Sequence, residues 1–158
     1  MALNVQLYLR IDRPDLAEKA LASLQTADDE AALTQLSSAL VYLALGGDKS
    51  KEASLVYKDL LDRHGPSLTV LNGLAVAYTA MRRYDDAERL LQEALAKAPG
   101  DADTLINLIA VAEQTGRANE AAGKYLPQLR EAAPAHPAVK QLDLALGSFD
   151  RVAASFAL

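Results

Sequence analysis

The side chains best suited to nucleophilic or acid–base chemistry are few and lie far apart in this sequence. The two histidines, His64 and His136, stand directly before a glycine and a proline, in stretches that read as helix ends. Ser67 is the only hydroxyl residue near a histidine in the sequence. A nucleophile needs a base within hydrogen-bond reach, but polar residues around a helix C-cap at Gly65 explain the same stretch. We therefore expect helix ends here and no catalytic pair.

Metal and cofactor sites are not expected either. The chain has no cysteine, and no acidic cluster accompanies the histidines, so the usual ligand sets for zinc are missing. The run Gly46-Gly47-Asp48-Lys49-Ser50 lacks the glycine spacing and the preceding strand of a phosphate-binding loop, and it favours a hairpin turn. The sequence therefore predicts a protein that is not an enzyme and holds no cofactor.

Composition narrows the class of protein further. The 158 residues are 51% hydrophobic, with alanine and leucine dominant, which suits packed helices. The formal net charge of −5 argues against non-specific nucleic-acid binding, which relies on basic patches. No apolar run approaches the roughly 20 residues of a membrane-spanning helix, and residues 1–15 do not resemble a signal peptide. We expect a soluble chain.

The elements that would position any functional residue are helices, and residues 67–99 show them most clearly. Leu71, Leu74, Ala75 and Tyr78 follow the i, i+3, i+4, i+7 spacing of one helix face. After a turn, a second helix repeats an apolar face from Ala87 onward. This spacing resembles the tetratricopeptide repeat, a helical hairpin of about 34 residues. Leucine and alanine replace the tryptophan and glycine that are common at two of its positions.

The same pattern recurs along the chain and predicts one all-α solenoid of stacked helical hairpins. Ala53, Ala87 and Ala121 are each 34 residues apart, and Tyr8 precedes Ala17 by the same nine residues that separate Tyr78 from Ala87. The expected parts are a truncated repeat at 1–25, repeats at 29–65, 67–99 and 101–133, and a C-terminal capping pair of helices at 137–157, separated at Gly147. Because Met1 falls inside the first hairpin, we expect a fragment of a longer protein that self-associates through apolar surface at its N-terminal end. The alternative is a naturally short starting helix.

Two places test this interpretation. In the repeat at 29–65, the leucines within 36–43 are expected in the core, with one extra residue in the following turn. The alternative register, which aligns Tyr42 with Tyr8, is rejected because it would bury Gln35 and Ser38. In the repeat at 101–133, Pro127 lies inside the second helix and is expected to kink it.

Several stretches go beyond the repeat consensus. Among them are Gly46–Gly47, Leu71-Asn72-Gly73 and Phe149-Asp150-Arg151. With them, the order of segments resembles the C-terminal half of the coatomer epsilon subunit family, over residues 5–21, 33–53, 70–95, 103–117, 125–137 and 148–157.

This resemblance implies a structural, non-enzymatic subunit of the COPI vesicle coat. It implies binding to the C-terminal region of the coatomer alpha subunit, indirect contact with other coatomer subunits, and a role in Golgi-to-ER and intra-Golgi transport. It also implies a cytoplasmic protein that is peripheral on Golgi membranes and COPI-coated vesicles, with only indirect membrane association. The alternative is a generic tetratricopeptide adaptor or co-chaperone scaffold of another complex.

In repeats of this type, the first helix of each hairpin lines the concave groove. We therefore expect partner contacts from these residues: Gln6, Arg10, Ser37, Val41, Asn72, Val76, Thr79, Ile106, Asn107, Ala110 and Glu113. Arg10 is the only cation in this set, so a clamp for a partner's terminal carboxylates, as in chaperone-tail receptors, is not expected. A neutral groove suits an extended segment held by van der Waals contacts and amide hydrogen bonds. Packing of Val76 and Ile106 against neighbouring helices would explain their apolar character equally well.

Overall fold

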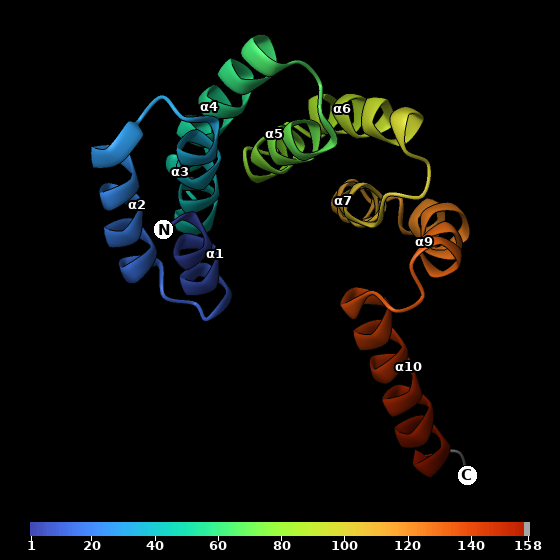
Figure 1. Cartoon of the computed structure of the whole chain (residues 1–158). Coiled ribbons are helices and arrows are strands. Elements are labelled where there is room, and N and C mark those ends of the chain that lie inside the picture. The colour runs from blue at the N-terminus through green and yellow to red at the C-terminus, as the bar shows by residue number, and fades with distance from the viewer. Residues whose placement is uncertain (157–158) are drawn as a thin grey trace. The chain divides into compact units, whose positions relative to one another are not determined.

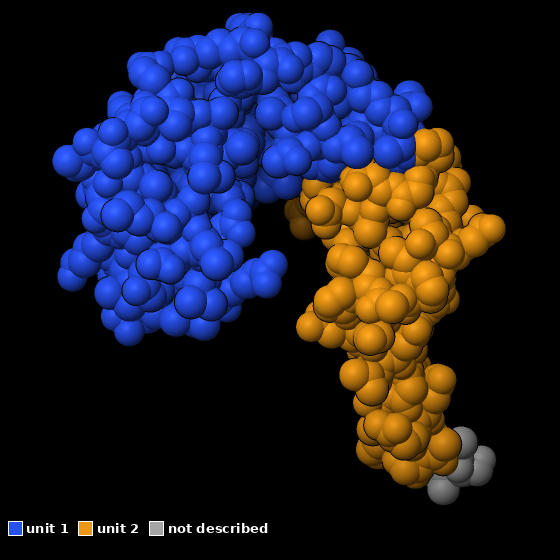
Figure 2. Space-filling view, in the orientation of Figure 1, with its two compact units in different colours: residues 1–98 blue, residues 99–158 orange. Residues whose placement is uncertain are grey.

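The computed structural model describes residues 1–156 and contains no strand among them (Figure 1). This confirms the expected all-α fold of helical hairpins. The chain divides into two compact units, residues 1–98 and the residues from Pro99 onward (Figure 2). Within residues 1–156, no helix combines the length and the apolar character needed to cross a membrane.

The first unit consists of three hairpins. Their helices are α1 (Ala2–Arg10), α2 (Pro14–Asp28), α3 (Ala32–Leu45), α4 (Lys49–His64), α5 (Leu68–Ala80) and α6 (Tyr84–Lys97). The first helices α1, α3 and α5 contact one another in succession, and α3 and α5 also pack against the second helix of the preceding hairpin. Each second helix buries an alanine at the matching place, as Ala17, Ala53 and Ala87 have no exposed side chain. These alanines allow the two helices of a hairpin to approach closely.

Three hairpin turns share one backbone geometry. Before α6, Arg82 adopts a φ of +58°, and the N–H of Arg83 donates to the carbonyl of Tyr78 at 2.8 Å. The turns before α2 and α8 repeat this geometry, with Asp12 and Gly116 at positive φ. This 6→1 hydrogen bond satisfies a helix-terminal carbonyl and fixes the direction of the next helix. The turn before α4 differs, because Gly46 and Gly47 both have positive φ.

The side chains of α3 do not face the core as the sequence suggested. The buried residues are Thr34, Ser37, Ser38, Ala39 and Val41, whereas the leucines within 36–43 are half-buried. Burial of Ser38 is therefore no reason to reject the register that aligns Tyr42 with Tyr8, and that part of the prediction was wrong. The serine hydroxyl is satisfied inside its own helix, since Ser38 Oγ donates to the carbonyl of Thr34 at 3.0 Å. Small residues suit this face because α3 packs against four helices, α1, α2, α4 and α5.

The second unit begins with α7 (Ala102–Gln114). The helix that follows is interrupted and consists of α8 (Ala118–Glu120), the π-helix η1 (Ala121–Tyr125) and α9 (Leu126–Ala132). Pro127 lies in the first turn of α9, directly after the π-helix. Because proline lacks an N–H and its ring crowds the preceding turn, a wider turn before it lets the helix continue. The second helix is thus interrupted just before Pro127 by one π-helical turn, and the kink expected at Pro127 stays a prediction.

The last element is one helix, α10 (Pro137–Phe156), and the expected pair of capping helices is wrong. Gly147 does not break it, since an isolated glycine in a helix costs only about 1 kcal/mol relative to alanine. The base of α10 is held by an ion pair between Arg130 and Asp143, at 2.7 Å. Residue 157, the last of the expected capping pair, lies outside the described residues.

Helices α4 and α5 meet at a glycine. A β-carbon added at Gly73 would overlap the ring of Tyr57, and Tyr57 is only 2% exposed. Gly73 therefore allows an aromatic ring to lie against the backbone of α5. Burial raises the pKa of the Tyr57 hydroxyl to about 12.

We predict that Gly73→Ala destabilises the fold by roughly 1–2 kcal/mol, because overpacking a buried ring outweighs the better helix propensity of alanine. Gly147→Ala is the matched control, since a β-carbon there meets no atom within 4 Å. It should leave the free energy of unfolding unchanged or raise it. Urea unfolding followed by circular dichroism measures both, and a neutral Gly73→Ala would contradict the proposed packing of Tyr57.

We also predict a stability loss at high pH that depends on Tyr57. Its pKa in the folded state lies above the ordinary value of 10.0, so the folded state retains the proton that the unfolded state releases. The stabilisation is complete below pH 10 and is lost as the pH rises towards 12, by about 2–3 kcal/mol. Tyr57→Phe, which cannot ionise, should lose correspondingly less stability between pH 9 and 12. Parallel unfolding curves for both proteins over this range would contradict the shift.

Candidate interaction surfaces

The residues considered for chemistry serve helix ends in the structure. His64 is the last residue of α4, and Ser67 caps α5, where its Oγ accepts a hydrogen bond from the N–H of Val70 at 3.3 Å. His136 Nδ1 accepts from the N–H of Ala138 at 3.2 Å, at the start of α10. Within residues 1–156, no group of three or more potential metal ligands comes together.

Three charged residues at the α5–α6 turn, Arg83, Asp86 and Arg89, pair with one another. Asp86 accepts hydrogen bonds from Arg83 and Arg89, which hold the pKa of its carboxyl below the usual range. The guanidinium of Arg83 also lies 4.4 Å from the centre of the Tyr78 ring. A hollow of about 350 Å³ lies beside this cluster and is also lined by Lys58. Because these charges pair within the chain, they stabilise the turn.

The predicted groove residues of the first unit divide into buried and exposed sets. Ser37 and Val41 are only 3% and 1% exposed, so their side chains support the packing of α3 and present no surface to a partner. Asn72 is also buried, and its Nδ2 donates to the carbonyl of Leu68 at 3.1 Å. Gln6 and Arg10 on α1 are exposed.

The accessible part of α5 consists of Val76 and Thr79. Val76 is 36% exposed, and the half-buried Thr79 donates its hydroxyl hydrogen to the carbonyl of Ala75 at 2.9 Å. Neither α3 nor α5 contains Asp, Glu, Lys or Arg, whereas α4 and α6 carry many charged residues. The first helices of this unit thus present an almost uncharged surface.

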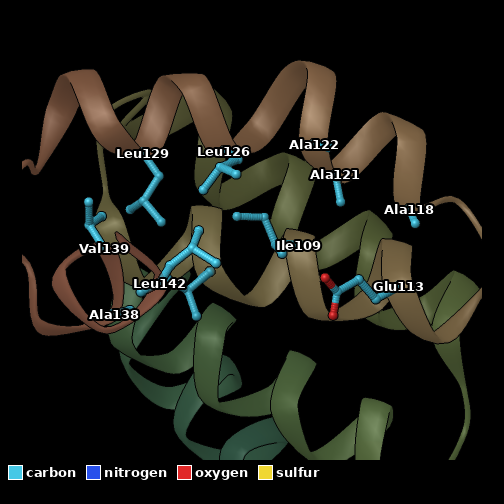
Figure 3. A pocket seen from close by; sticks show the side chains of 11 residues that line it. Ile109, Glu113, Ala118, Ala121, Ala122, Leu126, Leu129, Ala138, Val139 and Leu142 are labelled. Carbon is cyan, nitrogen blue, oxygen red and sulfur yellow. The ribbon is translucent and has the colours of Figure 1, made fainter. Parts of the chain in front are cut away.

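In the second unit, the four predicted residues lie on α7. Ile106 and Glu113 line the same pocket, which has a volume of about 370 Å³ (Figure 3). Asn107 is half-buried and Ala110 is exposed, and neither lines this pocket. The structure therefore brings two of the four residues into one concave site.

The other walls of this pocket were not predicted from the sequence. Ile109 comes from α7, Leu126 and Leu129 come from α9, and Val139 and Leu142 come from the base of α10. Figure 3 shows these apolar side chains converging, with the carboxylate of Glu113 at one end. Their helical spacing resembled that of ordinary core residues, so only the packing of three helices reveals the pocket.

Comparison with known proteins assigns the family. The model of the coatomer epsilon subunit family matches residues 1–157. This chain belongs to that family. It is 42% identical to coatomer subunit epsilon-2 of Oryza sativa subsp. indica over 151 residues, which cover 96% of this chain and 50% of that protein. It is 40% identical to coatomer subunit epsilon-1 of Arabidopsis thaliana, over 99% of this chain and 52% of that protein. It is 30% identical to the epsilon subunit of Caenorhabditis elegans, over 96% and 52%.

A solved structure supports the fold independently. A thermophilic tetratricopeptide-repeat protein of Thermus thermophilus matches with a TM-score of 0.75 and 22% identity, over 98% of this chain and 85% of that chain. At this identity the likeness concerns the fold alone. The chain spans about half the length of the epsilon subunits it matches.

Proposed function

We propose that the chain acts as a structural, non-enzymatic part of a COPI coat epsilon subunit and that its first helices bind the C-terminal region of the coatomer alpha subunit. The family match over residues 1–157 carries this proposal. The setting would be Golgi-to-ER and intra-Golgi vesicle transport. The protein would be cytoplasmic and would reach Golgi membranes through other coatomer subunits.

The chemistry of the first-helix surface supports a neutral partner segment. On α1, α3 and α5, Arg10 is the only charged side chain. Docking an uncharged segment here desolvates few charges, so apolar contact is not offset by a large electrostatic cost. The hydroxyls of the buried Ser37 and Ser38 donate to carbonyls of their own helix, so they compete little for hydrogen bonds with a partner.

The surface also favours this partner over an acidic tail. A receptor for terminal carboxylates needs several cations in register, and the first helices of residues 1–98 offer one. A co-chaperone function would therefore require cations that these helices lack.

We predict that Val76→Glu weakens binding of the alpha subunit's C-terminal region by about tenfold or more, because the new carboxylate must lose its hydration in the complex. The matched control is Leu55→Glu, which places the same charge at an exposed aliphatic residue of the second helix α4. It should change the Kd by about twofold at most.

Calorimetric titration of the purified chain with the alpha fragment measures both variants, and circular dichroism verifies that each retains its helicity. Absence of binding by the unmodified chain would contradict the proposed partner. Equal losses in the two variants, or a loss in Leu55→Glu alone, would contradict the proposed face.

A further inference from the structure

Helix α10 carries apolar side chains that no other described part of its own unit, residues 99–156, covers. Val139 is its only buried residue. Leu146, Phe149 and Phe156 are 47%, 70% and 79% exposed. Together with Leu142 and Ala153, these side chains follow one another at alternating steps of three and four residues. This is the a/d pattern of a helix that packs against another helix. We call this set the α10 stripe: Val139, Leu142, Leu146, Phe149, Ala153 and Phe156.

The α10 stripe is continuous with the pocket of the second unit. Val139 and Leu142 belong to both, and Figure 3 shows them turned towards Leu126 and Leu129 of α9. At about 1.5 Å per residue, the α10 stripe is about 25 Å long. A helix of some five turns laid along it would end at the pocket, where one of its apolar side chains can enter.

The charged residues of α10 are sorted around the helix. Asp143 and Asp150 are seven residues apart and flank the same edge of the stripe. With 100° of rotation per residue, Lys140 and Arg151 lie on the face of α10 that points away from the stripe. Asp143 is paired with Arg130 at 2.7 Å. Asp150 has no ion-pair partner within residues 1–156. The α10 stripe is thus an apolar seam whose edge carries one aspartate, Asp150, that no described residue of its unit neutralises.

We propose that the α10 stripe docks an amphipathic helix of another protein, one with large apolar residues at heptad spacing and lysine or arginine along the edge that meets Asp150. A second copy of α10 does not supply this complement. In an antiparallel pair, Asp143 of one copy would face Asp150 of the other, and in a parallel pair these carboxylates would face Ala138 and Ala145. This proposal does not depend on the partner proposed for the first helices.

The direct probe is a synthetic three-heptad peptide with leucine at a and d and lysine at e and g, compared with the same peptide carrying glutamate at e and g. Fluorescence anisotropy with the full chain should show the lysine peptide binding at least about tenfold more tightly than the glutamate peptide. Asp150→Lys should shrink this difference. Equal binding of both peptides by the unmodified chain would overturn the charge assignment.

Two variants locate the site. Phe149→Ser should weaken binding of the lysine peptide by about tenfold or more, because a full aromatic contact is lost. Leu144→Ser is the matched control, since Leu144 is also 70% exposed on α10 but lies opposite the stripe. It should bind like the unmodified chain. Both side chains are exposed, so neither change should unfold the protein.

The other possible occupants give distinct results. A dimer in sedimentation that Phe149→Ser dissociates and Leu144→Ser does not would identify a second copy and overturn the proposal. Sedimentation with anionic phosphatidylserine vesicles that depends on Phe149, without peptide binding, would identify a membrane surface and overturn it as well. A loss of peptide binding that is equal in both serine variants would show non-specific adhesion and would also overturn it.

Discussion

Close approach of helices through small side chains is the constraint on which the rest of this structure depends. Ala17, Ala53 and Ala87 have no exposed surface, and Ala121 takes the same place in the interrupted helix of the second unit. Each allows a second helix to lie against its first helix, and the buried serines of α3 allow that helix to pack against four others. Close packing of this kind makes volume changes costly. The surface of the first helices is almost free of charge, with Arg10 as the one charged side chain on α1, α3 and α5.

The sequence was sufficient for the hairpins because their signals are local. The i, i+3, i+4, i+7 spacing and the 34-residue recurrence of alanine depend on helix geometry alone. It was insufficient for α3, because hydrophobicity ranks leucine above serine, whereas the packing selects small residues whose hydroxyls bond within the helix. It was also insufficient at Gly147, where glycine and serine together resemble a break. A helix tolerates that cost when no turn sequence or proline follows.

For the candidate sites too, the sequence predicts the features that depend on local helix geometry and misses those that depend on how helices pack in three dimensions. Exposed residues on regular first helices, such as Gln6 and Val76, follow from helix geometry. Ser37, Val41 and Asn72 were expected on the groove surface but are buried, since burial there depends on how the neighbouring helices flank α3 and α5. The pocket of the second unit was only half anticipated, through Ile106 and Glu113, because its remaining walls come from α9 and α10 and meet only in three dimensions. Membership in the coatomer epsilon family rests on residues spread over the whole chain, and it gives these surfaces a biological setting.

The central claim is that the uncharged face of the first helices receives the alpha subunit. A structure of this chain bound to the C-terminal region of the coatomer alpha subunit tests it most directly. The account predicts an alpha-subunit segment lying across α1, α3 and α5, in contact with Gln6 and Val76 and with no ion pair except at Arg10. A complex in which that segment instead contacts the charged outer faces of α2, α4 and α6 would contradict it.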